Sequence, residues 1–154
     1  MLVQKLPGCW MVSHNKKYLE VLMKSDLNVG DKTSVSKIFT DEDVRGFSDL
    51  SLDKNPIHLD QAFAEESIFG KRIVHGMLVA SLFSGLLGMK LPGEGSIYLG
   101  QSLSFKAPIY IGDEVTATVE IIKIREDKPI VTLKTVCVNS KGVVVIEGEA
   151  VVKV

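Results

Sequence analysis

The chain has 154 residues, of which 45% are hydrophobic and 24% charged, and its formal net charge is −1. This length corresponds to one domain, and the composition is that of a folded protein rather than a disordered one. Because the charge is balanced and no basic block occurs, we expect no nucleic-acid partner. Cys9 and Cys137 lie far apart without metal-site spacing, so two free thiols in a reducing compartment are expected.

The first 25 residues differ in pattern from the rest of the chain. Residues 1–25 mix apolar and basic side chains without a sustained period, and we interpret them as a disordered or loosely attached arm ahead of one domain, residues 26–154. Lys5 and Pro7 interrupt the short apolar run there, which argues against a secretory signal. The apolar segment Ile73–Met89 is shorter than the roughly 20 residues of a membrane span, so no membrane association is expected. The expected location is the cytoplasm, or the mitochondrial matrix if the source is eukaryotic.

The first half of the domain combines one strand with a short helix. A strand is predicted over Thr33–Phe39, where a branched apolar residue alternates with small polar ones. A threonine then offers a helix N-cap, and a short helix is predicted over Asp41–Leu50. This helix places Val44, Phe47 and Leu50 on one face.

A proline-stiffened segment separates this helix from a longer apolar one. Asp53–His58 is expected to be a stiff turn and not regular helix, because Pro56 lacks an N–H and favours an extended residue before it. A short helical piece is predicted over Asp60–Glu66. The main helix is predicted over about His75–Lys90, and the proline and glycines of Pro92–Gly95 end it.

The last third of the chain has the composition of β-strands. Four strands are predicted over Ile97–Ala107, Glu114–Arg125, Ile130–Asn139 and Val143–Val154. Apolar and polar residues alternate along the second of these, which predicts one buried and one solvated face. Antiparallel strands following one apolar helix indicate an α+β fold with the helix on the sheet. An unpaired edge of such Val-rich strands is a liability in a monomer, so we expect a homodimer.

Small residues form a stripe along the main helix. Gly76, Ala80, Ser84 and Gly88 recur at spacings of four, so they share one face of the helix. Two interpretations stay open. The stripe either packs tightly against the sheet or a partner helix, or it leaves room for a ligand beside the helix.

Candidate catalytic groups lie in the proline-stiffened loop and at the start of the main helix. Asp53 and His58 can converge on one water molecule, because imidazole titrates near neutrality and a carboxylate can orient it. The alternative is an Asx-type turn with a surface histidine. His75 and Gly76 begin the main helix, where free N–H groups can stabilise a carbonyl oxygen that gains charge. Gly76 is alternatively only a small residue at a helix start. A metal site of Asp53, His58 and His75 matches no familiar ligand spacing, so no metal is expected.

The loop and the main helix together carry a family pattern. The segment 53–58 reads Asp-Lys-Asn-Pro-Ile-His and is followed by Leu-Asp and Ala-Phe-Ala. It resembles the hydratase motif of the MaoC-like hotdog enzymes, and residues 73–88 and 96–105 look like that family's central helix and following strand. The resemblance runs from about Leu27 to the C-terminus and is closest to the (R)-specific enoyl-CoA hydratases that supply polyhydroxyalkanoate synthesis.

The resemblance implies a hotdog fold, in which a curved antiparallel β-sheet wraps a long central helix, and a dimer. It implies (R)-specific hydration of trans-2-enoyl thioesters, carried by CoA or acyl carrier protein, and the reverse dehydration, in fatty-acid or polyhydroxyalkanoate metabolism. Asp53 and His58 would hold and activate the water, and the Gly76 N–H would bind the thioester oxygen. Ser84, Asn55 and His75 would line the substrate pocket. No cofactor is implied.

Two other functions fit the same fold. A hotdog thioesterase also acts on acyl thioesters, but it has no need of both Asp53 and His58 around Asn55. A non-catalytic acyl-thioester-binding module would need neither of them. The complete motif therefore favours the hydratase.

Overall fold

A computed structural model of the chain describes residues 26–154. The elements are β1 (Lys32–Ile38), α2 (Asp41–Ser51), α3 (Pro56–Leu59), α4 (Gln61–Glu65), α5 (Gly76–Met89), β2 (Ile97–Gln101), β3 (Ser104–Phe105), β4 (Glu114–Ile124), β5 (Ile130–Asn139) and β6 (Val144–Lys153). The arm expected over residues 1–25 lies outside the described residues, so the domain boundary stays a prediction. None of the helices between residues 26 and 154 has the length and hydropathy needed to cross a membrane.

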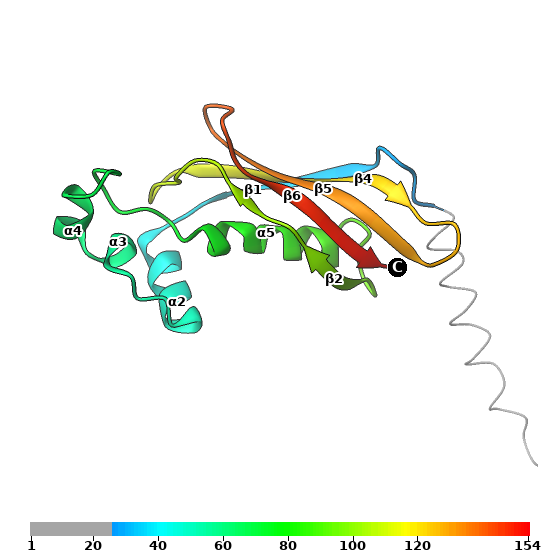
Figure 1. The fold of residues 1–154 in the computed structure, drawn as a ribbon, viewed down its shortest axis with the longest axis horizontal. Helices are drawn as coiled ribbons and strands as arrows, with labels where there is room; N and C mark the ends of the chain where they lie inside the picture. Colours follow the sequence, from blue (N-terminus) through cyan, green and yellow to red (C-terminus); the bar gives the residue numbers. More distant parts are fainter. Residues whose placement is uncertain (1–25) are drawn as a thin grey trace, which may run out of the picture.

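One antiparallel sheet forms the outer layer of the molecule (Figure 1). The strand order is β1-β4-β5-β6-β2, and the short β3 pairs with β6 beside β2. In β4 the apolar residues Val115, Ala117, Val119 and Ile121 are all fully buried, and the polar residues between them are not. The alternation predicted for this strand is therefore confirmed, and it gives the sheet one dry face.

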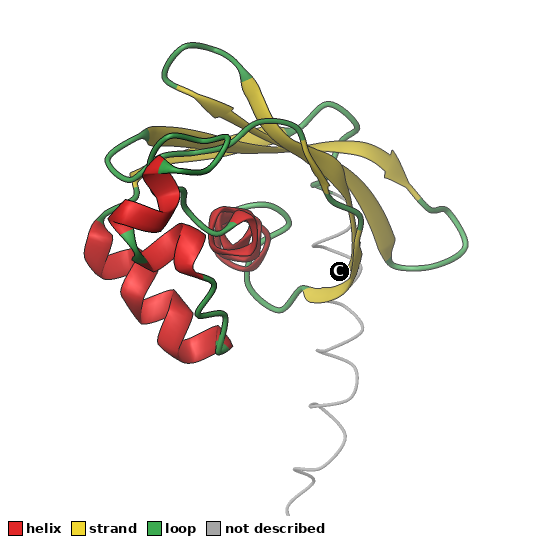
Figure 2. Ribbon diagram, turned by 60° about the vertical axis from the view of Figure 1, so that its left-hand side comes forward, coloured by secondary structure: helices red, strands yellow, loops and turns green. Residues whose placement is uncertain are grey.

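The dry face of the sheet wraps around α5. Viewed along its axis, α5 lies in the hollow of the curved sheet, and the three short helices gather to one side (Figure 2). The helix directs its large side chains into this core, with Val79, Phe83, Leu86 and Leu87 at most 2% exposed. This packing confirms the predicted α+β architecture with a central helix and a wrapped antiparallel sheet, the hotdog arrangement.

The small-residue stripe of α5 packs on the sheet over only part of its length. Ala80 is buried and Gly76 and Gly88 are half-buried, but Ser84 and the small residues beside it, Ser81 and Gly85, are exposed in the single chain. The sheet takes the large residues because they offer more apolar area to bury. Packing against the chain's own sheet is therefore wrong for the part of the stripe around Ser84, which faces outward.

Two predicted boundaries differ from the structure for local reasons. Pro56 begins a one-turn helix, α3, where a turn without helix was expected. Proline is tolerated at the first helical position because the N–H there has no intrahelical acceptor. The strand predicted over Ile97–Ala107 is divided into β2 and β3, and the chain between them crosses closely over Gly148 of β6. A Cβ at Gly148 would lie 1.9 Å from the Ser102 carbonyl oxygen, so only glycine fits there.

Helix α2 begins as predicted but buries a different residue. Thr40 and Asp43 form a reciprocal capping box at its N-terminus. Val44 is fully buried, but Leu50, expected on the same face, is 83% exposed. Ser48 is buried instead, because its hydroxyl donates a hydrogen bond of 2.7 Å to the Asp53 carbonyl. This bond ties α2 to the loop that follows it.

Candidate active site

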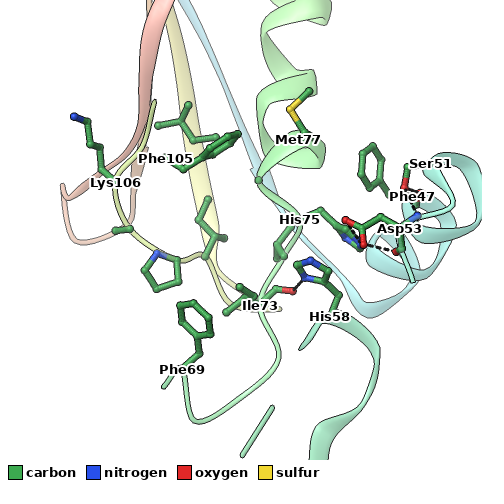
Figure 3. A pocket seen from close by; sticks show the side chains of 16 residues that line it. Phe47, Ser51, Asp53, His58, Phe69, Ile73, His75, Met77, Phe105 and Lys106 are labelled. Atoms are coloured by element: carbon green, nitrogen blue, oxygen red, sulfur yellow. Dashed lines mark hydrogen bonds and ion pairs between the residues drawn. The ribbon is translucent and has the colours of Figure 1, made fainter. Parts of the chain in front are cut away.

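A cavity of about 630 Å³ lies where the first turn of α5, the helices α2 and α3, and β3 meet (Figure 3). Its walls are mostly apolar and include three phenylalanines, Phe47, Phe69 and Phe105. The polar groups at the cavity come from Ser51, Asp53, His58, His75 and Lys106. An apolar pocket with a few convergent polar groups is the usual form of a small-molecule site.

The loop between α2 and α3 carries Asp53 and leads to His58, and helix caps on both sides hold it in place. Leu52 adopts the left-handed conformation, with φ of 65°, and ends α2. Asn55 caps α3, since its side-chain oxygen accepts from the N–H of Ile57 at 3.2 Å. Pro56 then fixes the first residue of α3. The chain is thus held on both sides of the peptide that carries Asp53.

Asp53 is anchored through its backbone while its carboxylate stays accessible. Its carbonyl oxygen accepts from the Ser48 hydroxyl at 2.7 Å and lies 3.1 Å from Nε2 of His75. The carboxylate oxygen Oδ1 accepts from the N–H of Asn55 at 3.2 Å. The side chain is 50% exposed, so solvent or a ligand can reach it.

His58 is held by a hydrogen bond that determines its neutral tautomer. Nδ1 lies 2.8 Å from the carbonyl oxygen of Ile73, the residue two before His75. A carbonyl oxygen can only accept, so Nδ1 carries the hydrogen. In the neutral ring Nε2 then has a free lone pair. His58 is only 8% exposed, and it lies in the wall of the cavity.

His75 lies between two aromatic neighbours and is almost completely buried. Its ring stacks on that of His58 with 3.7 Å between centroids and 28° between planes, and meets the edge of Phe47 at 5.1 Å. Burial lowers the pKa of His75, and the nearby His58 acts in the same direction, while Asp53 opposes the shift. Nδ1 of His75 is buried and has no hydrogen-bond partner in the described part of the chain.

The three groups converge on one point. A carboxylate oxygen of Asp53 and one ring nitrogen each of His58 and His75 lie within 4.8 Å of one another. One water molecule can bridge polar atoms at this separation. The donor types would also suit a metal ion, but imidazole lone pairs lie in the ring plane. Two rings stacked at 3.7 Å cannot direct their lone pairs at one shared ion. The arrangement favours proton transfer over metal binding.

Gly76 is the first residue of α5, directly beside this cluster. The N–H at this position has no intrahelical acceptor and lies at the positive end of the helix dipole. A Cβ here would lie 2.6 Å from a ring atom of Phe105, so any larger residue would have to displace that ring. Phe105 therefore packs directly against the backbone of the first turn and forms the cavity wall beside it.

The predicted site residues separate into two groups in space. Asp53, His58, His75 and Gly76 all line the cavity, whereas Asn55 and Ser84 do not line it in the single chain. Asn55 acts as the cap of α3, and Ser84 lies two turns along α5 on the exposed side. Their pocket roles stay predictions.

Sequence reasoning missed Ser48 and Phe105. Ser48 is a polar residue on the apolar face of α2, a signal that could have identified it. Phe105 comes near Gly76 only through the pairing of β3 with β6, which leaves no local signal.

Comparison with known proteins assigns the family. The family model described as "MaoC like domain" matches residues 25–142. An (R)-specific enoyl-CoA hydratase of Aeromonas caviae is 60% identical over 127 residues, covering 82% of this chain and 95% of that protein. The chain belongs to the MaoC-like family.

Two further comparisons show how widely this MaoC-like chain is related. The solved structure described as the (R)-hydratase from A. caviae involved in PHA biosynthesis has a TM-score of 0.83 at 59% identity, covering 84% of this chain and 98% of that one. A mitochondrial 3-hydroxyacyl-[acyl-carrier-protein] dehydratase of Arabidopsis thaliana is 40% identical, covering 88% of this chain and 82% of that protein. By name, these relatives act on acyl groups carried by CoA or by acyl carrier protein, and both names describe the addition or removal of water.

Proposed function

We propose that this chain catalyses the (R)-specific addition of water to trans-2-enoyl thioesters, giving (R)-3-hydroxyacyl thioesters, and the reverse dehydration. The observation that carries the proposal is the convergence of Asp53, His58 and the first N–H of α5 on one cavity. The 60% identity to an (R)-specific enoyl-CoA hydratase supports the same reaction. The hydro-lyase class follows from both.

The chemistry requires a base, a proton donor and an oxyanion site. Water forms its oxygen–carbon bond at C3 of the enoyl group, and the electron pair of the double bond moves towards the thioester oxygen. The N–H of Gly76 stabilises the charge that develops there. C2 then takes the proton that the water gave to the base and the thioester carbonyl is restored, so the net change is the addition of one water.

The two side chains supply the proton steps. The free Nε2 lone pair of His58 accepts a proton from the water, because its Nδ1 hydrogen is committed to Ile73. The accessible carboxylate of Asp53 holds the same water from its other side. The apolar cavity strengthens these polar contacts by excluding bulk solvent.

One assay separates the proposed function from its alternatives. Crotonyl-CoA is incubated with the protein, and the loss of enoyl absorbance is followed together with the release of free thiol. A hydratase removes the absorbance without thiol release, a thioesterase releases thiol, and a binding module does neither. A coupled dehydrogenase specific for the (S)-hydroxyacyl product is expected to give no signal, and a full signal contradicts the (R) assignment.

The same proposal includes a homodimer in the cytoplasm. β2 lies at the edge of the sheet, and Ile97, Leu99 and Phe105 on β2 and β3 are each 53% exposed. Such an apolar edge is expected to be covered by a second copy of the chain.

The proposed cytoplasmic location rests on the relatives. The 60% identical relative is bacterial, whereas the mitochondrial relative is 40% identical. A mitochondrial fraction containing the protein in its native cell would contradict the cytoplasmic assignment.

A further inference from the structure

His75 is buried more completely than either member of the catalytic pair, yet the reaction as derived above gives it no step. Its ring is 2% exposed and touches both partners of the pair. It stacks on His58 at 3.7 Å and lies 3.1 Å from the carbonyl oxygen of Asp53. A buried polar side chain that contacts both reacting groups calls for a functional explanation.

The contact with Asp53 determines which tautomer His75 adopts. The carbonyl oxygen of Asp53 has no hydrogen to give, so Nε2 of His75 must donate. The neutral ring therefore carries its hydrogen on Nε2 and leaves Nδ1 unprotonated. His58 has the opposite tautomer, because its Nδ1 faces the Ile73 carbonyl. The two stacked rings are thus held by two carbonyl groups from different parts of the chain.

The charge of His75 affects His58 because the two rings are stacked. A positive charge on His75 would repel the positive charge that forms on His58 when it takes a proton from water. The charged and titratable groups at the ring of His75 are Asp53 and His58, and burial lowers the pKa of His75. The unpartnered Nδ1 agrees with a neutral ring, since a protonated Nδ1 would leave a buried donor unsatisfied.

We propose that His75 is a positioning residue that acts as a neutral Nε2–H donor, holding the Asp53 carbonyl and orienting His58 by stacking. This inference rests on the proposed hydratase function. It assigns His75 no contact with the reacting atoms. The Asp53 carbonyl then has two donors, Ser48 from α2 and His75 from the start of α5, so the loop is tied to both helices.

The tautomers can be measured directly in the unmodified protein. The chain has three histidines, so nitrogen NMR of histidine-labelled protein gives few signals. A His14→Gln variant identifies the signal of His14, which leaves those of His58 and His75. At pH 7 His75 is expected to be neutral with its hydrogen on Nε2, and His58 to carry its hydrogen on Nδ1. A protonated His75, or a neutral one with its hydrogen on Nδ1, overturns the inference whether or not any His75 variant folds.

Two variants separate the hydrogen bond from the ring. His75→Phe keeps an aromatic ring for the stack but has no donor, and His75→Gln places a neutral N–H at the same distance along the side chain. We expect His75→Phe to lower kcat for crotonyl-CoA by about 10²-fold with KM within threefold, because misplaced catalytic groups lose rate more than binding. His75→Gln is expected to recover about tenfold of that loss.

The outcomes distinguish this inference from the proposed function. If unmodified protein does not hydrate crotonyl-CoA, the proposed function fails, while the NMR result still tests the tautomer. If unmodified protein is active and folded His75→Phe retains its kcat within threefold, the positioning role fails and the hydratase function stands. Equal losses in His75→Phe and His75→Gln also contradict a role for the Nε2 hydrogen bond.

Discussion

At the scale of single residues, the site depends on main-chain carbonyl groups that hold side chains in place. Ile73 holds His58, and the Asp53 carbonyl holds Ser48 and His75. These bonds leave the Asp53 carboxylate and Nε2 of His58 available for water. These atoms are accessible because the polar atoms behind them already have hydrogen-bond partners.

Replacing either member of the pair tests their direct role. Asp53→Asn and His58→Ala are each expected to lower turnover at least 10²-fold, because a positioned acid or base contributes about 10²–10⁴-fold. Crotonyl-CoA hydration rates and thermal melts are the measurements. A folded variant with a near-native rate would remove that residue from the mechanism.

The lowered pKa of His75 predicts a pH dependence of stability. Above the ordinary value of 6.5 the ring is neutral in both the folded and the unfolded chain. As the pH falls below that value, the unfolded chain takes up the proton first, so the folded state loses stability until the pH passes the lowered pKa of the folded protein. Melting temperatures measured between pH 8 and pH 5 are expected to fall more for unmodified protein than for His75→Gln. Parallel curves for the two proteins would show that His75 does not contribute.

At the scale of elements, the start of α5 serves the fold and the site at once. The large residues of α5 bury themselves in the sheet, and its first turn faces the cavity with a free N–H. Phe105 of β3 packs against Gly76, and a larger residue there would displace its ring. The pairing of β3 with β6 therefore determines the shape of the cavity beside the first turn of α5.

Removing the Gly76 N–H tests the oxyanion role. The backbone permits proline, since Gly76 is not among the positive-φ glycines and His75 before it has ψ of 129°, as a residue before proline requires. Any Cβ at Gly76 meets Phe105, so the comparison belongs in a Phe105→Ala background. There, Gly76→Pro is expected to be about 10²–10³-fold slower than Gly76→Ala.

Gly76→Ala is the matched control because it adds a Cβ and keeps the N–H. Circular dichroism and sizing establish that both double variants fold. Folded variants whose rates agree within about threefold, far less than the loss of one oxyanion donor, would show that the Gly76 N–H has no oxyanion role.

At the scale of the whole molecule, one edge of the sheet is apolar and uncovered in the single chain. Among the Val-rich C-terminal strands, β4, β5 and β6 each have a neighbour on both sides, and the edges of the sheet are β1 and β2. The apolar edge from which we expect dimerisation is therefore formed by the exposed residues of β2 and β3, and not by β4, β5 or β6. The exposed small-residue face of α5 is a second surface that a partner chain can approach closely.

A dimer through this edge is testable with matched variants. Sedimentation equilibrium at micromolar concentration is expected to give twice the 16.9 kDa of one chain. Leu99→Lys places a charge on the exposed side of β2 and is expected to shift the protein towards monomer. Val29→Lys is the control, because Val29 is 64% exposed but lies beside β1, at the opposite edge of the sheet. A monomer in unmodified protein, or an unchanged dimer in Leu99→Lys, contradicts the proposed interface.

The amino-acid sequence by itself determined the local structure and the chemical types at the site. Alternation in β4, the capping box of α2 and the apolar run of α5 depend on neighbours a few residues apart, so they can be predicted from spacing. The family motif of Asp53 and His58 likewise lies within six residues, and its resemblance to known hydratases gave the reaction.

Only the tertiary structure decided which of these groups meet. Asp53 and His75 are separated by 22 residues and Gly76 and Phe105 by 29, and no local pattern relates them. The contacts arise because the curved sheet buries one side of α5 and turns its first residue towards the loop after α2. The exposure of the small residues around Ser84 has the same cause, since the sheet packs on the side of the helix with the most apolar area. The site is formed by contacts between residues that are far apart in the sequence, and the spacing of residues along the chain does not encode these contacts.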